Sequence, residues 1–147
     1  MTAADGESAV LRDVERGRVH TLAADPGLAV GDVLRGTLAA DPPLEVTWTV
    51  AEETERWSVA VEVLEESPDD AEREAAADLA DGEGTTLERS GGETDVLAVP
   101  PARTAAAARE VAEDQATLTR AARLGVERVD VAAAEGVVAV RYGVATR

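Results

Sequence analysis

Alternation of apolar and polar residues in the first half of the chain most constrains its fold. In residues 44–50 the apolar side chains occupy every second position, and Glu45, Thr47 and Thr49 separate them. A period of two is typical of a strand in an antiparallel sheet that buries one face. Further short apolar runs lie at residues 8–14, 18–22, 33–38 and 57–63. Five short strands in about 60 residues predict a small antiparallel sheet or barrel, OB- or SH3-like.

The rest of the chain predicts helices as well as strands. Ser67 is a good N-cap before Pro68, so we expect a helix of about three turns that ends near Gly82. Asp114 and Gly125 are suitable N-terminal and C-terminal caps of a later helix. The other expected elements are helices at residues 103–112 and 115–124 and strands at 94–99, 126–132 and 137–142, with a short strand at 85–89.

These patterns predict an α+β protein built from two units. Residues 1–66 would form the antiparallel β unit. Residues 67–147 would form an α+β unit with a first helix, strands, two further helices and a C-terminal β-hairpin. No internal repeat or low-complexity linker separates the two units.

The charge composition indicates the solvent in which the protein works. The chain has no lysine and carries 30 acidic residues against 14 arginines, a net charge of −16. Such a charge repels itself in dilute buffer, whereas at molar salt the Debye length falls to about 3 Å and the repulsion is screened. An acidic protein from a GC-rich organism is the alternative, but GC bias explains only the missing lysine. We therefore expect a salt-adapted, halophilic protein.

Cysteine and long apolar segments are both absent from the sequence. Without cysteine there is no disulfide, thiolate nucleophile or Cys-based metal site. We find no signal segment and no apolar run near 18 residues, so we expect a cytoplasmic protein that makes no membrane contact. No pattern indicates a cofactor.

The residues that could carry catalysis all have a simpler structural interpretation. The acidic runs at residues 52–55 and 65–70 are expected at a strand end and a helix start, where solvated carboxylates are common. His20 is the single histidine, which cannot supply a multi-histidine zinc site. The glycines near residues 82–84 and 91–92 are interpreted as turns, and Trp48 and Trp57 as core. We assign no catalytic, cofactor-binding or metal-binding residue.

The distribution of charge points to the last third of the chain. Residues 1–66 have a net charge of −9, residues 67–93 of −7 and residues 94–147 of zero. Half of the arginines lie in this neutral part, and the arginine guanidinium suits phosphate and carboxylate recognition. Pairing of these arginines with carboxylates such as Glu127 and Asp130 is the alternative. The candidate anion- or partner-binding residues are Arg120, Arg123, Arg128 and Arg141.

Several segments resemble a small haloarchaeal family known only as a domain of unknown function. They are Leu44-Glu45-Val46-Thr47-Trp48, residues 120–129, residues 8–14 and Val19-His20-Thr21-Leu22. The resemblance covers most of the chain. It implies a haloarchaeal cytoplasm and no known activity, cofactor or catalytic residue. It also implies a further apolar strand before Thr2, so we expect this chain to start after that strand.

Three classes of function remain after the sequence analysis. We expect a non-catalytic interaction module that binds a protein partner through the arginine-bearing C-terminal face. An RNA-associated small-barrel protein is the alternative, although its β unit is acidic. An enzyme of unknown reaction comes third. The sequence indicates no oligomeric state.

Overall fold

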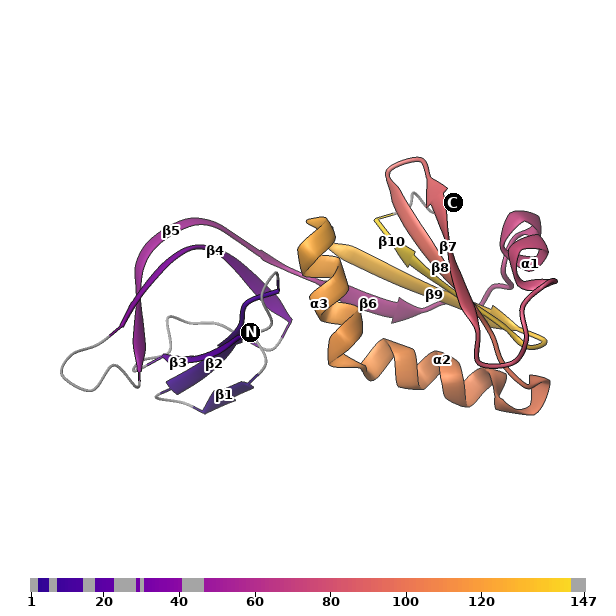
Figure 1. Cartoon of the computed structure of the whole chain (residues 1–147), viewed down its shortest axis with the longest axis horizontal. Coiled ribbons are helices and arrows are strands. Elements are labelled where there is room, and N and C mark those ends of the chain that lie inside the picture. The colour runs from indigo at the N-terminus through magenta and orange to yellow at the C-terminus, as the bar shows by residue number, and fades with distance from the viewer. Residues whose placement is uncertain are drawn as a thin grey trace. The chain divides into compact units, whose positions relative to one another are not determined.

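The computed structural model describes residues 3–5, 8–14, 18–22, 29, 31–40 and 47–143. The chain divides into two compact units, residues 1–59 and residues 60–147, and each contains its own five-stranded sheet (Figure 1). The three α-helices of the described residues all lie in the second unit. The predicted α+β class is therefore confirmed.

The sheet of residues 1–59 has the strand order β1-β2-β3-β5-β4. Neighbouring strands are antiparallel except β3 and β5, which run parallel where Leu22 pairs with Trp48. Among the described residues no pairing joins β1 to β4, so the sheet stays open there. Its strands are β1 (Ala3–Asp5), β2 (Ser8–Arg12), β3 (Val19–Leu22), β4 (Asp32–Ala40) and β5 (Trp48–Ser58).

Strand β5 corrects the prediction of two separate strands at residues 44–50 and 57–63. It runs without interruption through Glu52, Glu53 and Glu55, and residues 41–46 lie outside the described residues. The register with β4 shifts on either side of Gly36 and Thr37. A Cβ atom at Gly36 would overlap the carbonyl oxygen of Glu52, so glycine allows the two strands to approach at this irregularity.

The sheet of residues 60–147 has the order β6-β9-β10-β8-β7. All neighbours are antiparallel except β6 and β9, which are parallel. The strands are β6 (Ala60–Val63), β7 (Gly84–Arg89), β8 (Gly92–Ala98), β9 (Arg128–Ala134) and β10 (Val137–Tyr142). The helices are α1 (Asp70–Ala76), α2 (Thr104–Glu113) and α3 (Gln115–Leu124), and a 3-10 turn, η1 (Pro101–Arg103), precedes α2.

The division after Val59 differs from the predicted boundary after residue 66. The backbone N–H of Val59 donates to Gly31 in the first unit, whereas that of Ala60 donates to Glu127 in the second. One run of alternating apolar residues therefore supplies strands to two different sheets. The alternation predicts an extended chain but carries no information about which strand lies beside it.

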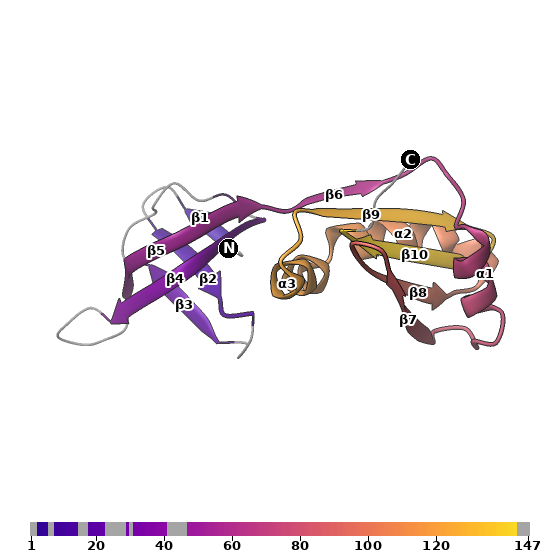
Figure 2. The same ribbon diagram turned by 90° about the horizontal axis from the view of Figure 1, so that it is seen from above.

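Strands β9 and β10 form the core of the second unit. Val129, Val131, Val138 and Val140 are each at most 2% exposed. Helix α2 packs against β6, β9 and β10 (Figure 2), and α1 packs against β7, β8 and β10. No helix of the described residues is long and apolar enough to cross a membrane.

Helix caps show where the local predictions are right and where one is wrong. Asp114 caps α3, and Gly125 ends it at φ 74°, both as predicted. The N-cap of α1 is Asp69 instead of Ser67, since its side chain accepts from the N–H of Glu72 while the Glu72 carboxylate accepts from the N–H of Asp69. The reciprocal pair satisfies two helix N–H groups, which Ser67 cannot do.

Candidate functional site

The four candidate arginines do not share one surface. Arg120 on α3 contacts the ring of Tyr142, whereas Arg141 is the preceding residue of β10. Consecutive residues of a strand point to opposite faces, so Arg120 and Arg141 lie on opposite faces of the sheet. Arg128 is on the Arg141 face, because its partner Asp130 is paired across the strands with Arg141.

Arg141 joins the sheet to helix α1 through a buried ion pair. Its Nε and Nη2 atoms donate to the two carboxylate oxygens of Glu72 at 2.9 and 2.8 Å, and its Nη1 atom donates to Glu66 at 2.8 Å. Arg141 is 8% exposed and Glu72 is fully buried. The hydrogen bonds to Glu72 raise the pKa of Arg141; burial opposes this shift, and the hydrogen bond to Glu66 adds to it.

Arg128, on the same face of the sheet as Arg141, makes ion pairs that are more exposed. Its Nε atom donates to Asp130 at 2.9 Å and its Nη2 atom to Glu62 at 2.7 Å. The hydrogen bond with Asp130 raises the pKa of Arg128. The pair with Glu62 is exposed on both sides and adds little to stability, whereas Asp130 is 1% exposed and depends on Arg128 as its partner.

Arg120 is held over the opposite face by two carboxylates and one aromatic ring. Its Nη2 atom donates to Glu93 at 2.7 Å and to Asp95 at 2.9 Å, and its guanidinium lies 5.1 Å from the Tyr142 ring centre. Burial lowers the pKa of Arg120, but the hydrogen bond and charge of Asp95 outweigh it and raise the pKa. Arg123 is exposed near the end of α3.

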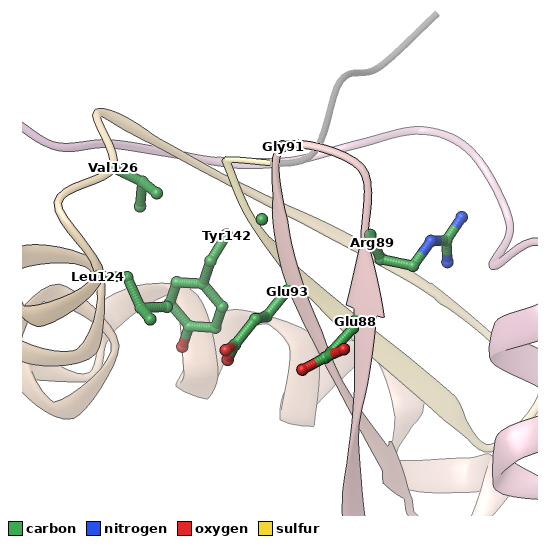
Figure 3. A pocket seen from close by; sticks show the side chains of 8 residues that line it. Glu88, Arg89, Gly91, Glu93, Leu124, Val126 and Tyr142 are labelled. Carbon is green, nitrogen blue, oxygen red and sulfur yellow. The ribbon is translucent and has the colours of Figure 1, made fainter.

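Next to Arg120 lies a pocket of about 320 Å³, which we call the hairpin pocket. It is bounded by the turn between β7 and β8, by the end of α3 and by β10 (Figure 3). Leu124, Val126 and the Tyr142 ring form its apolar wall, and Glu88 and Glu93 lie together at its acidic side, while Arg89 points away. Burial, followed by the charge of Asp95, raises the pKa of Tyr142.

The two acids of the hairpin pocket are direct neighbours across the strands. Glu88 of β7 is paired in register with Glu93 of β8. Like charges directly opposite each other destabilise an antiparallel pair. Arg120 compensates Glu93, whereas no described cation forms an ion pair with the exposed Glu88.

A turn of two residues sets this geometry. Ser90 and Gly91 connect β7 to β8, and Gly91 has φ 87°, which favours glycine. A Cβ atom at Gly92 would overlap the Tyr142 carbonyl oxygen, so glycine permits the close approach of the hairpin to β10. The sequence predicts a loop here, with one short strand at residues 85–89. Two polar runs around Ser-Gly were the available signal for a hairpin, and therefore for the Glu88–Glu93 pair.

Several of the other residues considered for catalysis have structural partners. Glu53 pairs with Arg56 at 2.6 Å and Glu55 with Arg35 at 3.2 Å, all on β4 and β5. His20 packs edge-on against Trp48, with ring centres 4.7 Å apart, and both side chains are half-buried. Within the described ranges no group of three or more His, Cys, Asp or Glu side chains could hold a metal ion.

Comparison with known proteins gives a family but no activity. Residues 1–133 match the family model described as "Family of unknown function (DUF5812)". The chain belongs to this family. No curated protein and no solved structure gave a significant match. The predicted membership of a domain family of unknown function is therefore confirmed, and the chemistry of the site must be argued from its own residues.

Proposed function

We propose that this protein is a non-catalytic interaction module that binds a cationic side chain of a partner protein in the hairpin pocket. The observation that carries the proposal is the like-charge pair of Glu88 and Glu93 beside an apolar wall, in which Arg120 compensates Glu93 but not Glu88. A guanidinium or ammonium group between the two carboxylates would remove their repulsion and form charge-assisted hydrogen bonds.

The apolar wall favours a side chain over a free ion. Arginine and lysine carry an aliphatic stem, which can pack on Leu124, Val126 and Tyr142 while the charged end reaches the carboxylates. A hydrated potassium ion gains nothing from such a wall. The pocket would therefore select a basic side chain even in a salt-rich cytoplasm. The excess of acidic residues supports such a cytoplasm as the environment of this protein.

The engagement of the arginines supports placing the binding surface at this pocket. Arg120, Arg128 and Arg141 are each bonded to carboxylates of their own unit. An acidic partner at these arginines would have to displace those carboxylates. Arg120 instead contributes indirectly, because it holds Glu93 at the side of the pocket.

Titration of the full chain with short blocked peptides tests the proposal. We expect a peptide with one arginine or lysine to shift the amide resonances of Glu88, Glu93 and Tyr142 in molar KCl, and a glutamine peptide to leave them unchanged. Glu88→Gln should weaken binding about fivefold, because an exposed ion pair is worth up to about 1 kcal/mol. Asp81→Asn removes the same charge from an exposed site outside the pocket lining and should leave binding unchanged. Equal shifts with the glutamine peptide would contradict the proposal.

The strand order of the first unit favours a second candidate, an RNA-associated small barrel. The order β1-β2-β3-β5-β4 with β3 parallel to β5 supports the proposal of an OB-like sheet, and OB barrels bind oligonucleotides over strands 2 and 3. Here the exposed face of these two strands carries Arg12, Val19 and Thr21. One arginine on an acidic unit is a weak basis for binding a phosphate backbone.

Fluorescence anisotropy with a labelled single-stranded RNA tests this candidate. Binding to phosphates is strongest at low salt, so we expect complex formation in dilute buffer, its loss as KCl rises, and weaker binding by Arg12→Glu. A chain that binds no RNA in dilute buffer while its tryptophan fluorescence remains native would contradict the candidate.

A further inference from the structure

Strand β7 forms an open edge of the second sheet. It is the last strand in the order β6-β9-β10-β8-β7, and no described strand pairs with its outer side. The N–H of Ala98 donates to the carbonyl of Glu83, so Glu83, Thr85, Leu87 and Arg89 face β8 along this ladder. The alternate residues Gly84, Thr86 and Glu88 therefore direct their backbone N–H and C=O groups away from β8.

Strand β7 carries the charged Glu88 and Arg89 but lacks other features that usually protect edge strands. The edge strand β4 of the other sheet has irregular register with β5, and the edge strand β6 has only four residues. Strand β7 has six residues, no proline and an unbroken register with β8. Residues 84–86 and Glu88 are exposed. An exposed edge of this length and regularity is a template for pairing with another strand.

We propose that β7 pairs antiparallel with β7 of a second copy of this chain, about a twofold axis at Thr86. This register pairs all three outward residues: Thr86 with the partner's Thr86, Gly84 with the partner's Glu88, and Glu88 with the partner's Gly84. Each pair exchanges two backbone hydrogen bonds. A shift of two residues along the strand leaves Gly84 or Glu88 unpaired.

Charge complementarity supports the same register. It places the exposed Glu83, whose carboxylate also accepts the Ala80 N–H at 2.7 Å, opposite the partner's Arg89, and the symmetric pair forms on the other side of the axis. Glu88 faces a glycine, so no like charges are opposed across the new interface. Asp69 already positions Arg89 through a 2.8 Å hydrogen bond, and the Arg89 side chain keeps 25% exposure.

Salt should strengthen this dimer. Each copy carries a net charge of −16, so association in dilute buffer works against long-range repulsion. At molar salt the Debye length is about 3 Å, which removes that repulsion but leaves the backbone hydrogen bonds in place. One strand pair buries little surface, so the dimer is weak and depends on protein concentration.

Sedimentation of the full chain over a range of concentrations tests the proposal. In molar KCl we expect the mean mass to rise from 15.2 kDa toward twice that value, and to stay near 15.2 kDa in dilute buffer wherever the chain remains folded. Thr86→Pro removes an outward N–H and places a ring at the free edge, so it should remain monomeric. Thr86→Ala is the matched control: it loses the same hydroxyl bond to Asp95 but keeps the N–H, and it should dimerise.

A second variant keeps the test decisive if Thr86→Pro fails to fold. Glu83→Arg opposes two arginines across the proposed interface and should reduce the dimer fraction at every concentration. Persistent monomer in molar KCl would overturn the proposal and leave the edge to a strand of another protein. A folded Thr86→Pro or Glu83→Arg chain that dimerises like the unchanged protein would overturn it as well, by placing the dimer contact elsewhere.

Discussion

The two sheets have the same number of strands but bury them to different extents. In residues 60–147, β9 and β10 are covered on both faces, and neighbouring residues such as Val140 and Arg141 are both buried. In the first unit the buried apolar side chains among the described residues are Leu22 and Val59. The described helices all belong to the second unit, where they cover the faces of its own sheet. The sheet of the first unit has no described helix over it, and many of its described side chains are half-exposed.

The ion pairs of the two units differ in the same way. Arg56 and Glu53 are three residues apart, and Arg35 and Glu55 are cross-strand neighbours. Arg141 and Glu72 are 69 residues apart and almost fully buried. Covering a sheet with the short helix α1 brought charged groups into the interior, where each must be paired. The comparison indicates that removing one partner of an ion pair costs most where helix α1 excludes water from it.

Both units can be followed separately in solution. Trp48 and Trp57 lie in residues 1–59, so tryptophan fluorescence reports the first unit. Helical circular dichroism reports the second unit, because the described helices are there.

Removal of Arg141 should have the largest effect. Arg141→Ala removes both guanidinium hydrogen bonds from the buried Glu72 and leaves its carboxylate the Asp69 N–H and Arg89, 3.6 Å away. We therefore expect the second unit to lose about 3–5 kcal/mol of unfolding free energy, measured by urea denaturation with helical dichroism. Arg56→Ala breaks an exposed pair and should change the fluorescence-detected value by less than about 1 kcal/mol. Similar losses from both variants would remove the distinction between the units. The double variant Glu72→Leu/Arg141→Met should recover most of the loss.

Two glycine substitutions should have similar effects in the two units. A Cβ atom at Gly92 overlaps the Tyr142 carbonyl, and one at Gly36 overlaps the Glu52 carbonyl. Alanine at either position should cost about 1–3 kcal/mol, detected by dichroism for Gly92 and by fluorescence for Gly36. Gly82→Ala meets no atom within 4 Å and only strains a φ of 90°, so about 1 kcal/mol is expected. A neutral Gly92→Ala would show that the hairpin can move away from β10.

Dilution of KCl should separate the two units. Repulsion within a chain of net charge −16 grows as salt is removed, and the first unit has fewer buried side chains to oppose it. We expect the fluorescence-detected melting temperature to fall by roughly 4–8 °C more than the dichroism-detected one, as 1 kcal/mol would produce in a small domain. Equal melting temperatures in molar KCl and dilute buffer would contradict the salt adaptation.

Acid should produce the smallest difference. Hydrogen bonds from Ser58 and Ala29 lower the pKa of Asp32 below its usual 3.8. Burial raises the pKa of Asp69, but hydrogen bonds from Arg89 and the Glu72 N–H outweigh burial and lower this pKa below 3.8. Both groups therefore add stability that is present above pH 3.8 and lost as the pH falls through their folded-state pKa values. Asp32→Asn should reduce the loss of stability on acidification of the first unit, measured by fluorescence. Asp69→Asn should do the same for the second unit, measured by dichroism. An unchanged pH dependence of stability in either variant would contradict the assignment.

Sequence patterns were sufficient for features that neighbouring residues control. Asp114 caps the start of α3 and Gly125 caps its end, and both effects act within one helical turn. The alternation before Val59 predicts extended chain for the same reason. The second sheet's use of residues 60–63 was missed, because pairing with β9 joins segments far apart in the sequence.

The candidate site shows the same difference between what the sequence predicts and what the tertiary structure decides. Its residue types were visible in the chain, and the absence of lysine already left arginine as the one strong cation for pairing. Which carboxylate each arginine holds was not visible, since Arg141 meets Glu72 across 69 residues and Arg120 meets Glu93 across 27. Charge composition and local periodicity follow from the order of residues alone. The placement of Arg120 and Arg141 on opposite faces, and of Glu88 beside Glu93, required the long-range strand register, because only that register brings distant backbone groups together.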